Sequence, residues 1–159
     1  MIDSPEFWSR GAYGAKVKTP FEMVVSAVRA TNADVTSAFL LARETQRMGE
    51  PLYRKVAPDG YSNANSDWVS SAGLLERMNF SLALAQNRIP GVRVDAAEWN
   101  MGAQPDPKRI EQFILGRNAS ARTDEDIEQA LQKAPKARPR RVAGIIAGLA
   151  LGSPDFQQR

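Results

Sequence analysis

Proline recurs in this sequence directly after a helix-capping residue, and that pairing constrains the fold more than any other feature. The pattern occurs as SPEF at 4–7, TPFE at 19–22, DPKR at 106–109 and SPDF at 153–156. Ser, Thr and Asp cap helix N-termini, and proline at the first helical position loses no hydrogen bond because that N–H has no helical partner. With RPRR at 138–141 added, half of the ten prolines mark expected helix starts. The chain is therefore predicted to be built from helices.

Hydrophobic periodicity between these starts predicts seven helical segments. They cover approximately residues 5–10, 20–30, 35–48, 67–87, 107–115, 123–133 and 139–151, with a weak helical turn at 96–100 and a closing turn at SPDF. Clusters of β-branched residues such as Val92-Arg93-Val94 are too short and too close to proline and glycine to predict a strand. We expect an all-α fold, a single compact domain over residues 1–159 with one long irregular loop.

Glycines stand four residues apart in the last long segment, at Gly144, Gly148 and Gly152. Small residues at this spacing share one helix face and let two helix backbones approach closely. The apolar run from Val142 to Leu151 has about half of the roughly 20 residues that a membrane-spanning helix needs. We therefore predict a buried helix and no membrane span, with Gly152 acting as the C-cap rather than as part of the packing stripe.

The chain contains no cysteine and no histidine. This excludes disulfides, thiolate ligands, Ser-His-Asp and Cys-His relays, and histidine-based metal sites. Acid–base chemistry would fall to Asp, Glu, Lys or Tyr, and no motif marks any of them as catalytic. The composition thus favours a protein without catalytic activity, and we predict no catalytic residue, no metal and no cofactor.

The longest irregular stretch, residues 50–66, exceeds the usual loop length, which indicates either function or mobility. Tyr53 and Tyr61 lie in it and Trp68 follows it, each offering an apolar face and a polar tip. Two interpretations are open. The three rings line a groove for a saccharide, a peptide or a neighbouring domain, or they pin the loop onto the helical core.

Polar residues in the following helix extend this candidate binding site. Arg77 and Asn79 flank Met78 in an otherwise apolar stretch, and a buried polar side chain must be hydrogen-bonded. We expect Asn79 to tie the long loop to the helix. The preceding NANSD at 63–67 is not a calcium loop, because Trp68 and Leu74 occupy the positions that require glycine and glutamate. Asn65, Ser66 or Asp67 is expected to cap the helix instead.

Basic residues cluster in the segment before the last long helix, although the whole chain carries a net charge of only +3. The cluster consists of Lys133, Lys136, Arg138, Arg140 and Arg141. Clustered cations can neutralise nucleic-acid phosphates, but this segment has no interleaved aromatic residues and no recognisable DNA- or RNA-binding motif. A solvated linker is the favoured interpretation, and nucleic acid is not the expected partner.

Three ordered phrases resemble the bacterial family known as domain of unknown function 1800. They are SPEFWSRGAYGAKVKTPFEMVVSAVRAT, RMGEPLYRKVAPDGYSNANSDWVSSAGLLERMNF and LALGSPDFQQR. The phrases are similar to the C-terminal part of that family. The resemblance implies a helical C-terminal portion of a larger, often exported protein, and no established activity or catalytic residue. The chain departs from the family in lacking its histidine-containing N-terminal part, and in the loop sequence EPLYRKVAPDGY, where the family more often has Gln-Pro and paired prolines.

Three functional hypotheses follow. The first is a non-catalytic scaffold or interaction module of an exported bacterial protein, with the missing N-terminal domain or another protein as its partner. The second is an envelope polysaccharide-acting enzyme that uses two carboxylates, of which Asp59 and Asp67 lie nearest the aromatic loop. The third is a nucleic-acid binder that uses residues 133–141. No signal peptide is evident in the residues themselves, so a periplasmic or extracellular location is an expectation from the resemblance alone.

Overall fold

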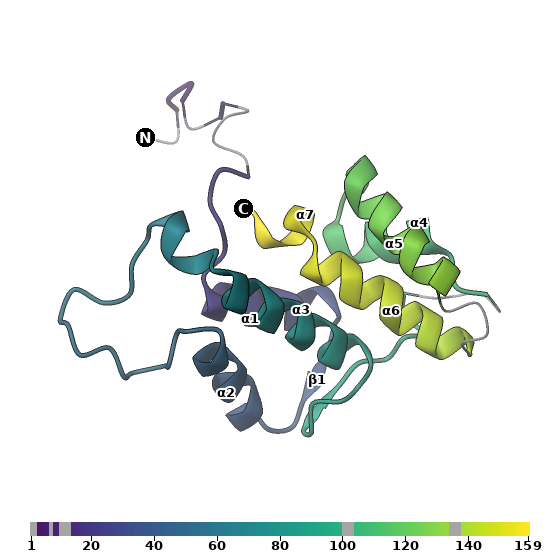
Figure 1. The fold of residues 1–159 in the computed structure, drawn as a ribbon, viewed down its shortest axis with the longest axis horizontal. Helices are drawn as coiled ribbons and strands as arrows, with labels where there is room; N and C mark the ends of the chain where they lie inside the picture. The colour runs from purple at the N-terminus through teal and green to yellow at the C-terminus, as the bar shows by residue number, and fades with distance from the viewer. Residues whose placement is uncertain (1–2, 7, 10–13, 100–103, 134–137) are drawn as a thin grey trace.

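Seven α-helices and one small sheet make up the described part of the chain, which in this computed structural model comprises residues 3–6, 8–9, 14–99, 104–133 and 138–159 (Figure 1). The helices are α1 (Pro20–Ala30), α2 (Phe39–Arg47), α3 (Ser71–Ala85), α4 (Pro107–Leu115), α5 (Ala121–Lys133), α6 (Pro139–Gly152) and α7 (Pro154–Gln157), with a 3-10 helix at Asn65–Trp68. Strands β1 (Asp34–Val35) and β2 (Val92–Arg93) pair antiparallel. The prediction of a helical fold is confirmed.

Three of the predicted proline starts have the expected caps. Thr19 and Glu22 form a capping box at α1, in which Glu22 Oε2 accepts from the Thr19 amide at 2.9 Å. Asp106 accepts from the first amides of α4, and Ser153 accepts from the Phe156 amide in α7. In SPEF, the described residues form turns, and Phe7 lies outside the described residues. Short-range capping thus determines where most helices begin.

Helices α3 and α6 lie side by side at the centre of the molecule (Figure 1). Their contact depends on the predicted glycine stripe, because a Cβ at Gly148 would lie 2.7 Å from Leu82 Cδ2 and 3.0 Å from Leu82 Cα. The prediction that Gly152 caps the helix was wrong. Gly152 is the last residue of α6 and packs on Met78, while Ser153 ends the helix in extended backbone since it must also cap α7.

A single hydrophobic cluster joins these two helices to the others. Each of five helices contributes a side chain that is at most 1% exposed: Met23, Phe80, Ile110, Ile127 and Ile146. Figure 1 shows α1 and α2 on one side of the central pair and α4 and α5 on the other. The core therefore connects α1 and α2 to α4 and α5 through the central helices α3 and α6.

The prediction that no strand forms was wrong. Residues Asp34 and Val35 pair with Arg93 and Val92, and the neighbouring Gly91 carbonyl accepts from the Thr36 amide at 2.9 Å. A two-residue strand has no periodicity for a sequence to display, and its partner lies far away along the chain. Because this segment is extended, α2 begins at Phe39 rather than directly after Asp34.

Other helix ends differ from prediction by a few residues. Helix α3 begins at Ser71, because the side chain of Ser70 caps it by accepting from the Gly73 amide, and Asn65, Ser66 and Asp67 are in the preceding 3-10 helix instead. Helix α5 begins at Ala121, two residues before the predicted start. Residues 96–99 form the predicted turn, and Asn100 lies outside the described residues.

Candidate functional site

The long loop between α2 and the 3-10 helix projects away from the helical body (Figure 1). The side chains of Tyr53 and Val56 in this loop are fully exposed. Tyr53 also has a φ of +58°, a left-handed conformation that is uncommon for residues other than glycine. Two apolar side chains are therefore held in solvent at the end of the loop, although burial would be favourable for both.

The base of the same loop is fixed to the core. Tyr61 donates to the carbonyl of Pro51, and Trp68 Nε1 donates to the carbonyl of Ser62 at 3.0 Å. The rings of Tyr61 and Trp68 are 6.3 Å apart and tilted by 55°. These two rings join residues at the two ends of the loop to one another. Tyr53 does not join them.

Arg77 and Asn79 lie on different sides of α3. Arg77 is 1% exposed and donates to the Lys18 carbonyl at 2.8 Å. Burial lowers the pKa of its guanidinium, with Glu50 opposing that shift. Asn79 is exposed and makes no side-chain hydrogen bond within the described part of the chain. Two residues two positions apart on a helix point about 200° apart, so this divergence follows from helix geometry.

The five predicted binding residues are therefore not brought together as one site. Tyr61 and Trp68 are adjacent, Tyr53 is exposed further along the loop, Arg77 is in the interior and Asn79 is on the surface of α3. Their role in binding stays a prediction. The structure presents a different surface beside the loop.

An apolar groove of about 350 Å³ separates α1 from α2. One helical row from each helix forms its walls: residues 21, 24, 25 and 28 of α1 and residues 38, 41, 42 and 45 of α2. Thr45 is the one polar wall residue in these rows, and its hydroxyl already donates to the Ala42 carbonyl at 2.7 Å. Arg29 lies at the rim, and Leu52 connects the groove to the long loop. The groove thus continues into the segment that carries Tyr53.

Sequence analysis missed this groove although its signal is present. Phe21 at the start of the α1 row remains 46% exposed. Only Val24 of this row is fully within the core, at 3% exposure. Helix α1 carries more apolar residues than packing against the core requires, and this excess could have indicated a second, exposed apolar surface.

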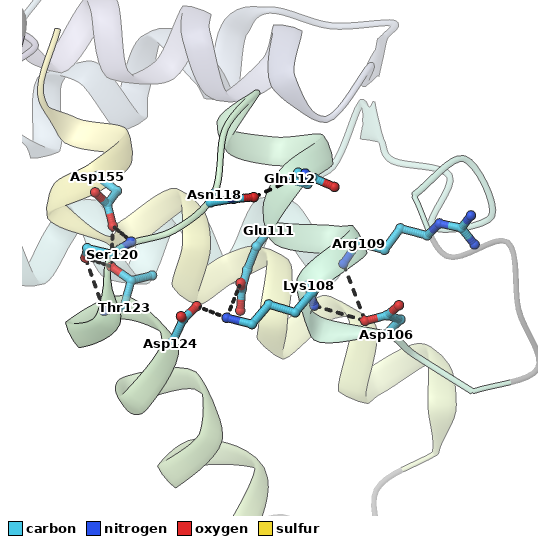
Figure 2. A network of polar contacts seen from close by, with 10 residues as sticks. All are labelled: Asp106, Lys108, Arg109, Glu111, Gln112, Asn118, Ser120, Thr123, Asp124 and Asp155. Atoms are coloured by element: carbon cyan, nitrogen blue, oxygen red, sulfur yellow. Dashed lines mark hydrogen bonds and ion pairs between the residues drawn. The ribbon is translucent and has the colours of Figure 1, made fainter.

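The carboxylates that the structure does bring together are Glu111 of α4 and Asp124 of α5, with the Lys108 ammonium between them (Figure 2). Glu111 is 2% exposed, and burial raises the pKa of its carboxyl, assisted by a hydrogen bond with Asp124. The pKa of Asp124 is lowered, chiefly by the hydrogen bond from Lys108. The Lys108 ammonium thus pairs with two carboxyl groups whose pKa values are shifted in opposite directions.

Asp155 forms a second part of the same network (Figure 2). It accepts from the Ser120 amide at 2.9 Å and from Thr123 Oγ1 at 2.8 Å. Burial alone would raise the pKa of Asp155, but these hydrogen bonds and the nearby Arg117 outweigh it and lower the pKa. The carboxylate thereby fixes the N-terminus of α5 against α7, which is a structural task.

This arrangement does not suit glycoside hydrolysis. That reaction needs two carboxyl groups about 5–9.5 Å apart across a substrate cleft, whereas Glu111 is buried and the Lys108 ammonium lies between it and Asp124. Asp59 and Asp67, the pair nearest the aromatic loop, are both exposed. Within the described residues no group of three or more Asp or Glu side chains is placed to hold a metal ion.

None of the helices in the described part of the chain is both long enough and apolar enough to cross a membrane. A family model with the description "Protein of unknown function (DUF1800)" matches residues 1–158. Neither the curated proteins nor the solved structures include a match to the chain.

Proposed function

The chain belongs to the DUF1800 family of proteins of unknown function, and on that premise we propose that it is a non-catalytic interaction module of an exported bacterial protein. Its contact surface is the α1/α2 groove together with residues 51–60 of the adjoining loop, hereafter the docking surface. Its partner is a polypeptide segment, from another protein or from a longer form of this chain.

The observation that carries the proposal is an open apolar groove that Leu52 connects along the chain to a loop with two fully exposed side chains. Phe21 opens on the groove, Leu52 closes one end of it, and Tyr53 and Val56 follow in the loop. Contiguous exposed apolar surface rimmed by polar residues is typical of interaction sites. Burying such surface is the main favourable term in protein association.

The dimensions of the groove suit a helical partner. The first and last wall positions on each helix are seven positions apart along the chain, which corresponds to about 10.5 Å at 1.5 Å per residue. A helix that offers apolar side chains at positions i, i+3, i+4 and i+7 spans the same length. Because Thr45 is the one polar side chain in the two wall rows and its hydroxyl is already bonded, a segment whose backbone is satisfied internally is preferred.

Site-specific photocrosslinking in the native host tests this proposal. A benzophenone amino acid replaces Tyr53 or Val25 in the full chain, and Phe113, which is 42% exposed on α4, is the matched control position. We expect discrete protein adducts from positions 53 and 25, and loss of the position-53 adduct when Val25→Asp is added. Equal adducts from Phe113, or no adduct from the docking surface, would contradict the proposal.

A further inference from the structure

A second hollow of about 320 Å³ lies where α6 begins beside the end of α3. Arg138, Arg140 and Arg141 line one side of it. Ala85, Gln86 and Asn87 line the other, with Ala96 from the turn that follows β2. None of these residues lines the docking surface.

The charge of this hollow is not balanced by the residues around it. No acidic residue lines it, and none of the three arginines forms an ion pair or side-chain hydrogen bond with another described residue. The four neighbouring residues that lie outside the described part, 134–137, contain one lysine and no acid. Since arginine stays protonated at any physiological pH, the hollow carries three uncompensated positive charges.

The remaining lining residues determine what can fit. The side chain of Asn87 donates to the Val94 carbonyl and accepts from the Val94 backbone amide. Its position beside the hollow is therefore fixed. Gln86 makes no side-chain hydrogen bond within the described residues and adds a free amide. No aromatic side chain lines the hollow, so nothing there would stack on a nucleic-acid base.

We infer that this hollow is a binding site for a phosphate-bearing small ligand, a mono- or diphosphate group. Guanidinium groups bind phosphate through paired hydrogen bonds, and a diphosphate carries a charge comparable to that of three arginines. The volume is at the lower end of the range of small-molecule sites. The uncapped start of α6, where Arg138 makes no side-chain cap and the first turn has no acid, adds favourable potential for an anion.

The site explains why the basic cluster is confined to one segment. Arg138, Arg140 and Arg141 are exposed, but they are not spread over unrelated parts of the surface. Instead these three residues meet the end of a helix that lies more than fifty residues earlier in the chain. The site is separate from the docking surface, so it stands whether or not the proposed function does.

Titration of the full chain with inorganic pyrophosphate, followed by calorimetry and by NMR of the Gln86 and Asn87 amides, tests the inference. We expect saturable binding that weakens at least tenfold in a variant with Arg138, Arg140 and Arg141 all changed to Gln. The matched control changes the exposed residues Arg43, Arg109 and Arg122 to Gln and alters the net charge equally. We expect this control to bind within about twofold of the wild-type chain.

Two further arms separate specific recognition from general attraction. A variant with the three arginines changed to Lys keeps the charge but loses the paired hydrogen bonds, and should bind several-fold more weakly than wild type. A single-stranded oligonucleotide should bind less tightly than pyrophosphate. Equal losses in both Gln variants, tighter steeply salt-dependent oligonucleotide binding, or no pyrophosphate binding at low salt would each overturn the inference.

Discussion

The α3–α6 interface buries its apolar side chains, whereas the docking surface leaves apolar side chains exposed to solvent. Between α3 and α6, glycines bring the helices so close that no side chain would fit at Gly148 without moving Leu82. At the docking surface, by contrast, Tyr53 and Val56 contact solvent alone, and an open groove separates α1 from α2. The first region is complete within the chain. The second region consists of apolar side chains like those of a core, but no other described element covers them. We therefore assign it to the binding of a protein partner.

The largest expected effect comes from opening a cavity in the packed region. Ile146 of α6 is 0% exposed, and changing it to Ala should lower the free energy of unfolding by about 2–5 kcal/mol. The fully exposed Val56, changed to Ala, should alter it by less than about 0.5 kcal/mol. Equilibrium urea unfolding measures both. Similar losses for the two variants would mean that the loop packs on the core and that the contrast is false.

A smaller effect is expected from adding a methyl group where the helices touch. Gly148→Ala should destabilise by about 1–3 kcal/mol, because Leu82 can relieve the contact only by shifting its backbone. Gly152→Ala is the matched control: its new methyl would meet the flexible thioether of Met78, which can turn away. Thermal unfolding should rank Gly148→Ala well below Gly152→Ala. The reverse order would show that α6 is free to move away from α3.

The loop anchor should be weaker still. Trp68→Phe removes the donor to the Ser62 carbonyl and should cost about 1 kcal/mol. The loss should be local, so hydrogen exchange at residues 51–64 should accelerate while exchange in α6 stays unchanged. If exchange accelerates in α6 as well, Trp68 supports the core and not only the loop.

The smallest expected effect on stability comes from Glu111, the buried carboxyl of α4. The pKa of Glu111 is raised in the folded state, so its stabilising contribution is complete below its ordinary pKa of about 4.5 and is lost as pH rises through the folded pKa. Glu111→Gln cannot lose a proton, so its stability relative to wild type should increase from pH 4.5 upward. Glu128→Gln, at an exposed position of α5, is the control. Parallel stability curves for wild type and Glu111→Gln would contradict the raised pKa of Glu111.

The predicted site residues are only partly close together in the structure, and the reason is local geometry. Tyr61 and Trp68 were correctly expected to be near each other, because both flank one short segment whose ends are fixed. Arg77 and Asn79 were grouped by proximity in sequence, although helix geometry already placed them on different sides of α3. The basic cluster was recognised, but Gln86 and Asn87, which line the same hollow, directly follow α3 and could not be inferred.

The sequence by itself determined where four of the helices begin and which helix could be packed closely. The starts at Pro20, Pro107, Pro139 and Pro154 were predicted because proline suits the first helical position, and the stripe of glycines because helical periodicity is local. Tertiary structure alone decided the β1/β2 pair, the groove beside α2 and the arginine-lined hollow. Each of these joins segments that are distant along the chain. No local pattern reports such contacts, since they exist only after the core has fixed the helices relative to one another.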